Sequence, residues 1–172
     1  MNLLTDGAPA LALGMEKGDP DVMERPPRPP DESIINRLML IRIGIMTVAL
    51  TVVTLMAFWL GMHWRGVTLA ETMAFVTLAL AELPIAYTAR SERYPLYRMR
   101  ILSNRWMQRA VGLSIVLMLL VIYVPFLNRP FNTVPLDLQH WATLVPLILF
   151  PALTAELTKW AIRRGEAMRT FG

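Results

Sequence analysis

Four long apolar stretches dominate this sequence and limit what the chain can fold into. They cover residues 43–62, 72–89, 110–128 and 138–155, and Glu82 is the one acidic residue within them. An α-helix of about 20 apolar residues crosses a lipid bilayer and satisfies its own backbone hydrogen bonds. The sequence therefore predicts an all-α, polytopic membrane helical bundle with four full transmembrane helices.

The composition agrees with a membrane protein, because 55% of the residues are hydrophobic and 17% are charged, a more apolar mixture than soluble domains have. The net charge of +4 would by itself also fit a nucleic-acid-binding protein. The basic residues, however, lie in the links between the apolar stretches. We therefore expect the lipid bilayer, and not a nucleic acid, to be a partner.

The distribution of lysine and arginine predicts how the chain is oriented. Residues 15–42 carry five, the next link carries one, residues 90–109 carry six, the following link carries one, and the part from Lys159 onward carries four. This alternation is what the positive-inside rule requires. It predicts that the Pro-rich segment, the Arg-rich loop and the C-terminus face the cytoplasm.

Ahead of these stretches, residues 2–14 read NLLTDGAPALALG, an apolar run that is too short to cross a bilayer. We interpret residues 1–14 as a partial transmembrane helix, the second half of a helix whose first half is absent. Residues 15–37 form a predicted Pro-rich cytoplasmic loop, in which the four prolines at positions 26, 27, 29 and 30 favour a stiff extended spacer or docking arm. Residues 38–172 form the predicted four-helix transmembrane domain with a cytoplasmic C-terminus.

The partial helix carries a candidate cation site. On a helix Asn2, Thr5 and Asp6 share one face, which presents an amide, a hydroxyl and a carboxylate. Pro9 has no N–H to give to the Thr5 carbonyl, and Gly7 loosens the backbone between them. Interrupted membrane helices build cation sites in this way. Alternatively, Thr5 or Asp6 is the N-cap of a short interfacial helix.

A similar arrangement occurs around Glu82, near the middle of the 72–89 stretch. An ionised carboxylate at that depth costs at least about 2.5–3.5 kcal/mol unless something compensates it. Pro84 releases the carbonyl of Leu80 beside it. These features favour an ion ligand or a proton carrier, and the alternative is a protonated Glu82 sealed in the bundle by hydrogen bonds.

The sequence also resembles a known family, and the resemblance rests on several motifs in order along the chain. They are NLLTDGAPALALG, DVMERPPRPPDESII, RSE at 90–92, SNRW at 103–106, YVPFLNRPF at 123–131, PLDLQHW at 135–141 and AELTKW at 155–160. Together they resemble the C-terminal transmembrane region of the P-type cation-transporting ATPases, in the calcium-pump-like branch. By this resemblance the chain starts within the sixth membrane helix of that family and continues through the tenth.

The resemblance implies that Asn2, Thr5 and Asp6 match sixth-helix metal ligands and that Glu82 matches an eighth-helix carboxylate. It implies Ca²⁺ as the cation, and the remaining helices and cytoplasmic domains of a parent ATPase as partners. The chain lacks the DKTGT phosphorylation motif and the TGE actuator motif, so ATP and Mg²⁺ are expected only in the complete parent protein. Because a buried Ca²⁺ ion takes six to eight oxygen ligands, this chain is expected to supply part of the site and not to hydrolyse ATP alone.

Two other functions are compatible with the residues. One is a self-contained small oligomeric transporter that uses Asp6 and Glu82 for proton coupling. The other is a regulatory partner that docks onto a complete pump. The cation-site interpretation makes the sharpest structural prediction, namely that Asp6 and Glu82 face each other across the helical bundle.

Overall fold

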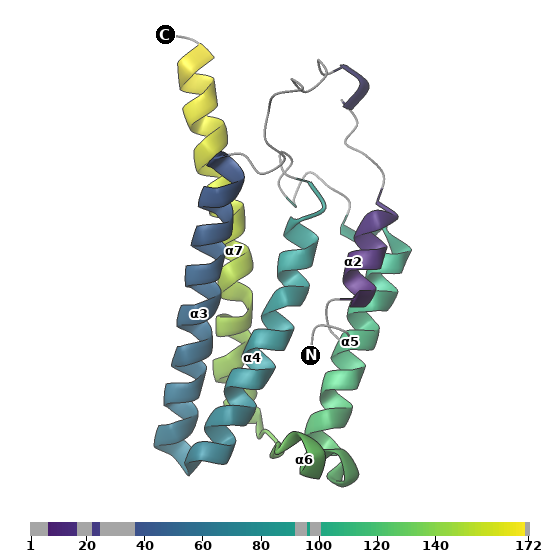
Figure 1. Cartoon of the computed structure of the whole chain (residues 1–172), viewed down its shortest axis with the longest axis vertical. Helices are drawn as coiled ribbons and strands as arrows, with labels where there is room; N and C mark the ends of the chain where they lie inside the picture. The colour runs from purple at the N-terminus through teal and green to yellow at the C-terminus, as the bar shows by residue number, and fades with distance from the viewer. Residues whose placement is uncertain (1–6, 17–21, 25–36, 92–95, 97–100, 171–172) are drawn as a thin grey trace.

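The computed structural model describes residues 7–16, 22–24, 37–91, 96 and 101–170, with side chains as far as residue 162. These residues form α-helices and short 3-10 turns and no β-strand, which confirms the all-α class (Figure 1). The α-helices are α2 (Gly7–Gly14), α3 (Arg37–Arg65), α4 (Val67–Thr88), α5 (Arg105–Tyr123), α6 (Pro125–Phe131) and α7 (Leu138–Thr170), and the 3-10 turns are η1 (Val22–Glu24) and η3 (Ile101–Ser103).

Within the described part of the chain, four helices are long and apolar enough to cross a membrane: α3, α4, α5 and the Leu138–Ile162 part of α7. The predicted count of four transmembrane helices is therefore confirmed. α3 has 29 residues, which corresponds to about 44 Å at 1.5 Å per residue. It is thus longer than the roughly 30 Å hydrocarbon core of a bilayer.

The apolar stretch at 110–128 does not form one helix. α5 ends at Tyr123, Val124 adopts an extended conformation, and Pro125 is the first residue of the separate helix α6. The residue before a proline is disfavoured in the α conformation, because its backbone clashes with the proline ring. α6 in turn ends at Phe131 and is followed by Asn132, which has a φ of 51° in the left-handed region.

α4 lies at the centre of the bundle, with α3 and α7 on one side and α2 and α5 on the other (Figure 1). Of the residues in its most apolar window, 56% are buried, compared with 11% for α3. The main apolar core joins α4 to α3, α5 and α7. A smaller apolar cluster, built on Ala12, Met107 and Ala110, joins α2 to α5.

α3 and α4 form a tight hairpin. Only Gly66 separates them, and its φ of 87° is easily adopted by glycine because it has no Cβ. One turn before the end of α3, a Cβ on Gly61 would lie 2.5 Å from the Cα of Ala70. The two backbones approach this closely because small residues meet there, as is common between membrane helices.

Candidate cation site and its surroundings

Glu82 is the one predicted ligand within the described residues. It lies on α4, is half-buried, and lines a cavity of about 570 Å³ between α3, α4 and α7. α4 continues through Pro84 to Thr88 without a break. The helix therefore carries this carboxylate on an uninterrupted segment, although Pro84 cannot donate to the carbonyl four residues before it.

Two basic side chains line the same cavity as Glu82. Arg42 lies in the second turn of α3, and Lys159 lies on α7. The Nε of Arg42 is buried and has no hydrogen-bond partner. Lys159 is neutralised by an ion pair with Glu156, so within this lining the basic side chain of Arg42 remains to balance the Glu82 carboxylate. A Ca²⁺ ion held by Glu82 would need several further oxygen ligands, because a buried Ca²⁺ ion takes six to eight.

Lys159 is more buried than its position in the sequence suggests. Three residues after Glu156 and near the predicted cytoplasmic end of the last span, it fits an ion pair with Glu156 and a side chain that extends toward water. The ion pair is present, with Nζ 3.0 Å from Glu156 Oε1. The lysine is nevertheless only 7% exposed, because Nζ also donates to the Thr88 carbonyl at the end of α4, 2.5 Å away.

The other three predicted ligands, Asn2, Thr5 and Asp6, lie outside the described residues. The described chain begins one residue after Asp6, with the first turn of α2 at Gly7. Among the described residues there is no group of three or more His, Cys, Asp or Glu side chains that could hold a metal ion. The proposed facing arrangement of Asp6 and Glu82 thus stays a prediction.

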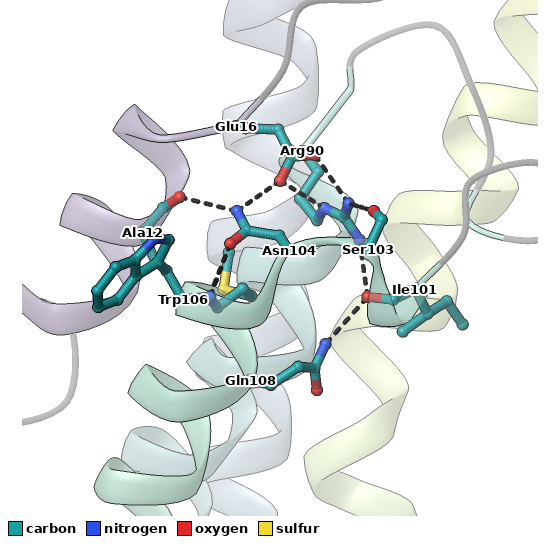
Figure 2. A network of polar contacts seen from close by, with 9 residues as sticks. Ala12, Glu16, Arg90, Ile101, Ser103, Asn104, Trp106 and Gln108 are labelled. Carbon is teal, nitrogen blue, oxygen red and sulfur yellow. Dashed lines mark hydrogen bonds and ion pairs between the residues drawn. The ribbon is translucent and has the colours of Figure 1, made fainter.

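A second polar site, which sequence reasoning did not find, joins the end of α2 to the end of α4 (Figure 2). Arg90 donates from Nε and Nη2 to the two carboxylate oxygens of Glu16, at 2.8 Å each. Its Nη2 also donates to Ser103 Oγ at 2.7 Å, and its Nη1 donates to the Ile101 carbonyl at 3.0 Å. The Arg90 side chain is 1% exposed and that of Glu16 is 13% exposed. This is therefore a buried, bidentate ion pair.

Asn104 connects this ion pair to α5. Its Oδ1 accepts from the backbone N–H groups of Trp106 and Met107, which caps the N-terminus of α5. Its Nδ2 donates to Glu16 Oε2 at 2.8 Å and to the Ala12 carbonyl in the last turn of α2 at 2.9 Å. One amide thus satisfies backbone groups at the ends of two helices. We call Glu16, Arg90, Ser103 and Asn104 the Arg90 clamp.

The clamp also determines the charge state of its carboxylate. The hydrogen bond from Arg90 lowers the pKa of Glu16 below its ordinary value of 4.5, against the opposing effect of burial, and the hydrogen bond from Asn104 and the positive charge of Arg90 lower it further. Hydrogen bonds and an opposite charge both favour the ionised form. Glu16 is therefore a carboxylate at neutral pH.

Three residues of the clamp lie in motifs noted in the sequence, but the motifs did not show that these residues meet. Arg90 opens the RSE motif, and both Ser103 and Asn104 belong to the SNRW motif, and both motifs contribute to the family resemblance. Glu16 and Arg90 are 74 residues apart along the chain. Nothing in their local spacing indicates that they pair.

The helices and the buried polar contacts together define a multi-pass helical membrane domain. Comparison with known proteins identifies it further: the family described as cation transporting ATPase, C-terminus, matches residues 1–161. The chain belongs to this family, which confirms the resemblance found in the sequence.

Individual relatives agree with the family. The chain is 37% identical over 153 residues to a calcium-transporting ATPase of Bacillus subtilis, covering 88% of this chain and 17% of that protein. It is 33% identical over 171 residues to calcium-transporting ATPase 1 of Schizosaccharomyces pombe, covering 99% of this chain and 19% of that protein. With calcium-transporting ATPase type 2C member 1 of Homo sapiens it shares 31% identity over 170 residues, covering 98% of this chain and 18% of that protein. The chain thus spans less than a fifth of the length of these relatives.

Proposed function

We propose that this domain supplies part of the intramembrane cation site of an ATP-driven calcium pump. Asn2, Thr5, Asp6 and Glu82 are the proposed ligands, and Ca²⁺ is the proposed cation. In this proposal ATP and Mg²⁺ act in the remainder of the pump, whose other helices complete the ligand set. The Pro-rich segment and the C-terminus face the cytoplasm.

The observation that carries this proposal is the place of Glu82. A carboxylate half-buried in the most buried membrane helix is costly unless it serves a function or is compensated. The relatives named above are calcium-transporting proteins, and carboxylate, amide and hydroxyl oxygens are the ligands that Ca²⁺ takes. Since the described residues contain no group of three or more His, Cys, Asp or Glu side chains that could hold a metal ion, we propose that the remaining oxygens come from residues 2–6 and from the rest of the pump.

The proposal can be tested in a chimera. The region of the Bacillus subtilis calcium-transporting ATPase that matches this chain is replaced by it, and ATP-dependent uptake of radioactive Ca²⁺ is measured in inverted membrane vesicles. We expect Asp6→Asn and Glu82→Gln to lose uptake at Ca²⁺ concentrations that saturate the parent chimera. Glu71→Gln is the matched control, because Glu71 lies on the same helix and accepts only an exposed hydrogen bond from Asn132 Nδ2 among those described.

Retention of uptake by both ligand variants, at unchanged Ca²⁺ dependence, would contradict the proposed site. The 172-residue chain reconstituted alone in liposomes serves as a second test. We expect no Ca²⁺ flux from it. A flux driven by a proton gradient and lost in Glu82→Gln would instead support the self-contained transporter.

A further inference from the structure

The position of α2 depends on few apolar contacts. This helix has eight residues, of which Pro9 and Ala12 are buried, whereas Leu11 is 77% exposed. Between helices in a membrane, apolar contact adds little by itself, because lipid tails are as apolar as the side chains. Specific polar contacts therefore have a larger share in fixing where α2 lies.

The Arg90 clamp provides such contacts at one end of α2. It joins three helix ends: the C-terminal end of α2 through Glu16 and the Ala12 carbonyl, the C-terminal end of α4 through Arg90, and the N-terminal end of α5 through Asn104 (Figure 2). The Arg90 guanidinium donates to Glu16 after α2 and to Ile101 and Ser103 of η3. Because a planar guanidinium binds a carboxylate in a fixed geometry, the clamp restricts both sliding and rotation of α2 against α4.

The same two segments carry the two proposed carboxylate ligands. Glu82 lies eight residues before Arg90, which is about 12 Å along a helix. Asp6 directly precedes the first residue of α2, and Glu16 follows the last residue of that helix by two positions. A displacement at the clamp therefore moves α2 as a whole relative to the segment that bears Glu82.

We infer that Arg90 is a positioning residue: it fixes α2 relative to α4, the helix that carries Glu82. The link to the ligands rests on the proposed function, whereas the link between α2 and α4 does not. Nothing in this role requires Arg90 to touch the cation.

The first test measures the position of α2 in the whole chain. The sequence has no cysteine, so cysteines introduced at Leu11 on α2 and Leu78 on α4, both exposed, carry the only two spin labels. Distances are measured by electron–electron double resonance in lipid nanodiscs. We expect one narrow distance distribution in the parent chain. Arg90→Lys keeps the positive charge but removes the planar guanidinium that binds both Glu16 oxygens. We expect it to broaden or split the distance distribution.

Arg65→Lys is the matched control for this substitution. Arg65 forms an exposed ion pair with Asp137, at 3.2 Å and with its side chain 68% exposed. We expect this variant to keep the parent distribution. If Arg90→Lys also kept it, with the same mean and the same width, the inference would be overturned.

The second test asks whether the position of α2 affects cation binding. In the chimera, we expect Arg90→Lys to raise the Ca²⁺ concentration for half-maximal uptake by about tenfold, since displacements of about 1 Å have effects of that order or larger. The maximal rate should change much less. A lowered maximal rate at an unchanged half-maximal concentration would indicate a merely structural role and overturn the link to the ligands. If the chimera showed no uptake at all, the proposed function would fail, and the label distances would still decide whether Arg90 positions α2.

Discussion

α4 is held on its two sides by different kinds of contact. Toward α3 the contact combines the main apolar core with a close approach of the two backbones at Gly61 and Ala70. Toward α2 the apolar cluster is small, and a buried ion pair with its hydrogen-bond partners makes the connection. The α3 side therefore depends on shape, and the α2 side depends on charge and hydrogen-bond geometry.

The α3 side and the α2 side of α4 should therefore respond differently to substitutions. Close packing of small residues fails when volume is added, because the backbones have to separate. A buried ion pair fails when one partner is removed, because the other charge is left without compensation in a poorly solvated place. Each side should thus be sensitive to substitutions that leave the other side intact.

The largest effect is expected from Glu16→Gln, which leaves the guanidinium of Arg90 buried without its carboxylate. Breaking a buried pair costs about 3–5 kcal/mol, and we expect about 3 kcal/mol here because Glu16 keeps some exposure to solvent. Hydrogen exchange measured by mass spectrometry should show protection of α2 amides falling by about 100-fold, at 1.4 kcal/mol per factor of ten. The α3–α4 hairpin should keep its protection, and equal loss in both regions would contradict the distinction between the two sides.

A smaller effect is expected from Gly61→Ala on the other side. The added Cβ would lie 2.5 Å from Ala70 Cα and 2.7 Å from its backbone nitrogen, so the hairpin has to open, at a cost of about 1–3 kcal/mol. Unfolding free energies in bicelles, measured by steric trapping, would show the loss.

Gly44→Ala is the control for this substitution, since nothing lies within 4 Å of a Cβ at that position of α3. It should be neutral or stabilise the helix by up to about 1 kcal/mol. Equal values for the two variants would mean that close approach of α3 and α4 contributes nothing to stability.

The smallest effect is expected from acid, which weakens only part of the clamp. Because the pKa of Glu16 is lowered in the folded chain, its carboxylate contributes stability that is present above its unfolded pKa, with an ordinary value of 4.5. That stability is lost as the pH falls through the lower, folded pKa. Because the pKa of Glu16 is lowered, mild acid protonates only part of the population, so the loss is smaller than in Glu16→Gln.

Protection of α2 amides, corrected for the intrinsic exchange rate at each pH, should therefore be constant near neutral pH and fall in acid. The Glu16→Gln chain should lack this dependence. An equal fall in that variant would assign the acid effect to another group.

Much of the fold followed from the sequence because membrane spans have a strong local signal. A run of apolar residues long enough to cross a bilayer leaves a helix as the only way to pair its backbone, and this predicted α3, α4, α5 and α7. The same reasoning did not predict the break at Pro125, because hydropathy does not distinguish a proline that ends a helix from one that lies inside a helix, as Pro84 does in α4. The sequence also predicted that Glu82 is a carboxylate at membrane depth, because the depth of a residue follows from its position within an apolar stretch.

The sequence by itself thus determined the helices and the family, and it predicted which residues carry oxygen ligands at membrane depth. Only the tertiary structure decided which side chains meet: that Lys159 turns inward to the Thr88 carbonyl, and that Arg90 pairs with Glu16 across 74 residues. The physical reason is that helix formation depends on neighbours along the chain. An ion pair between helix ends depends instead on how whole helices pack, and no local pattern of residues records that.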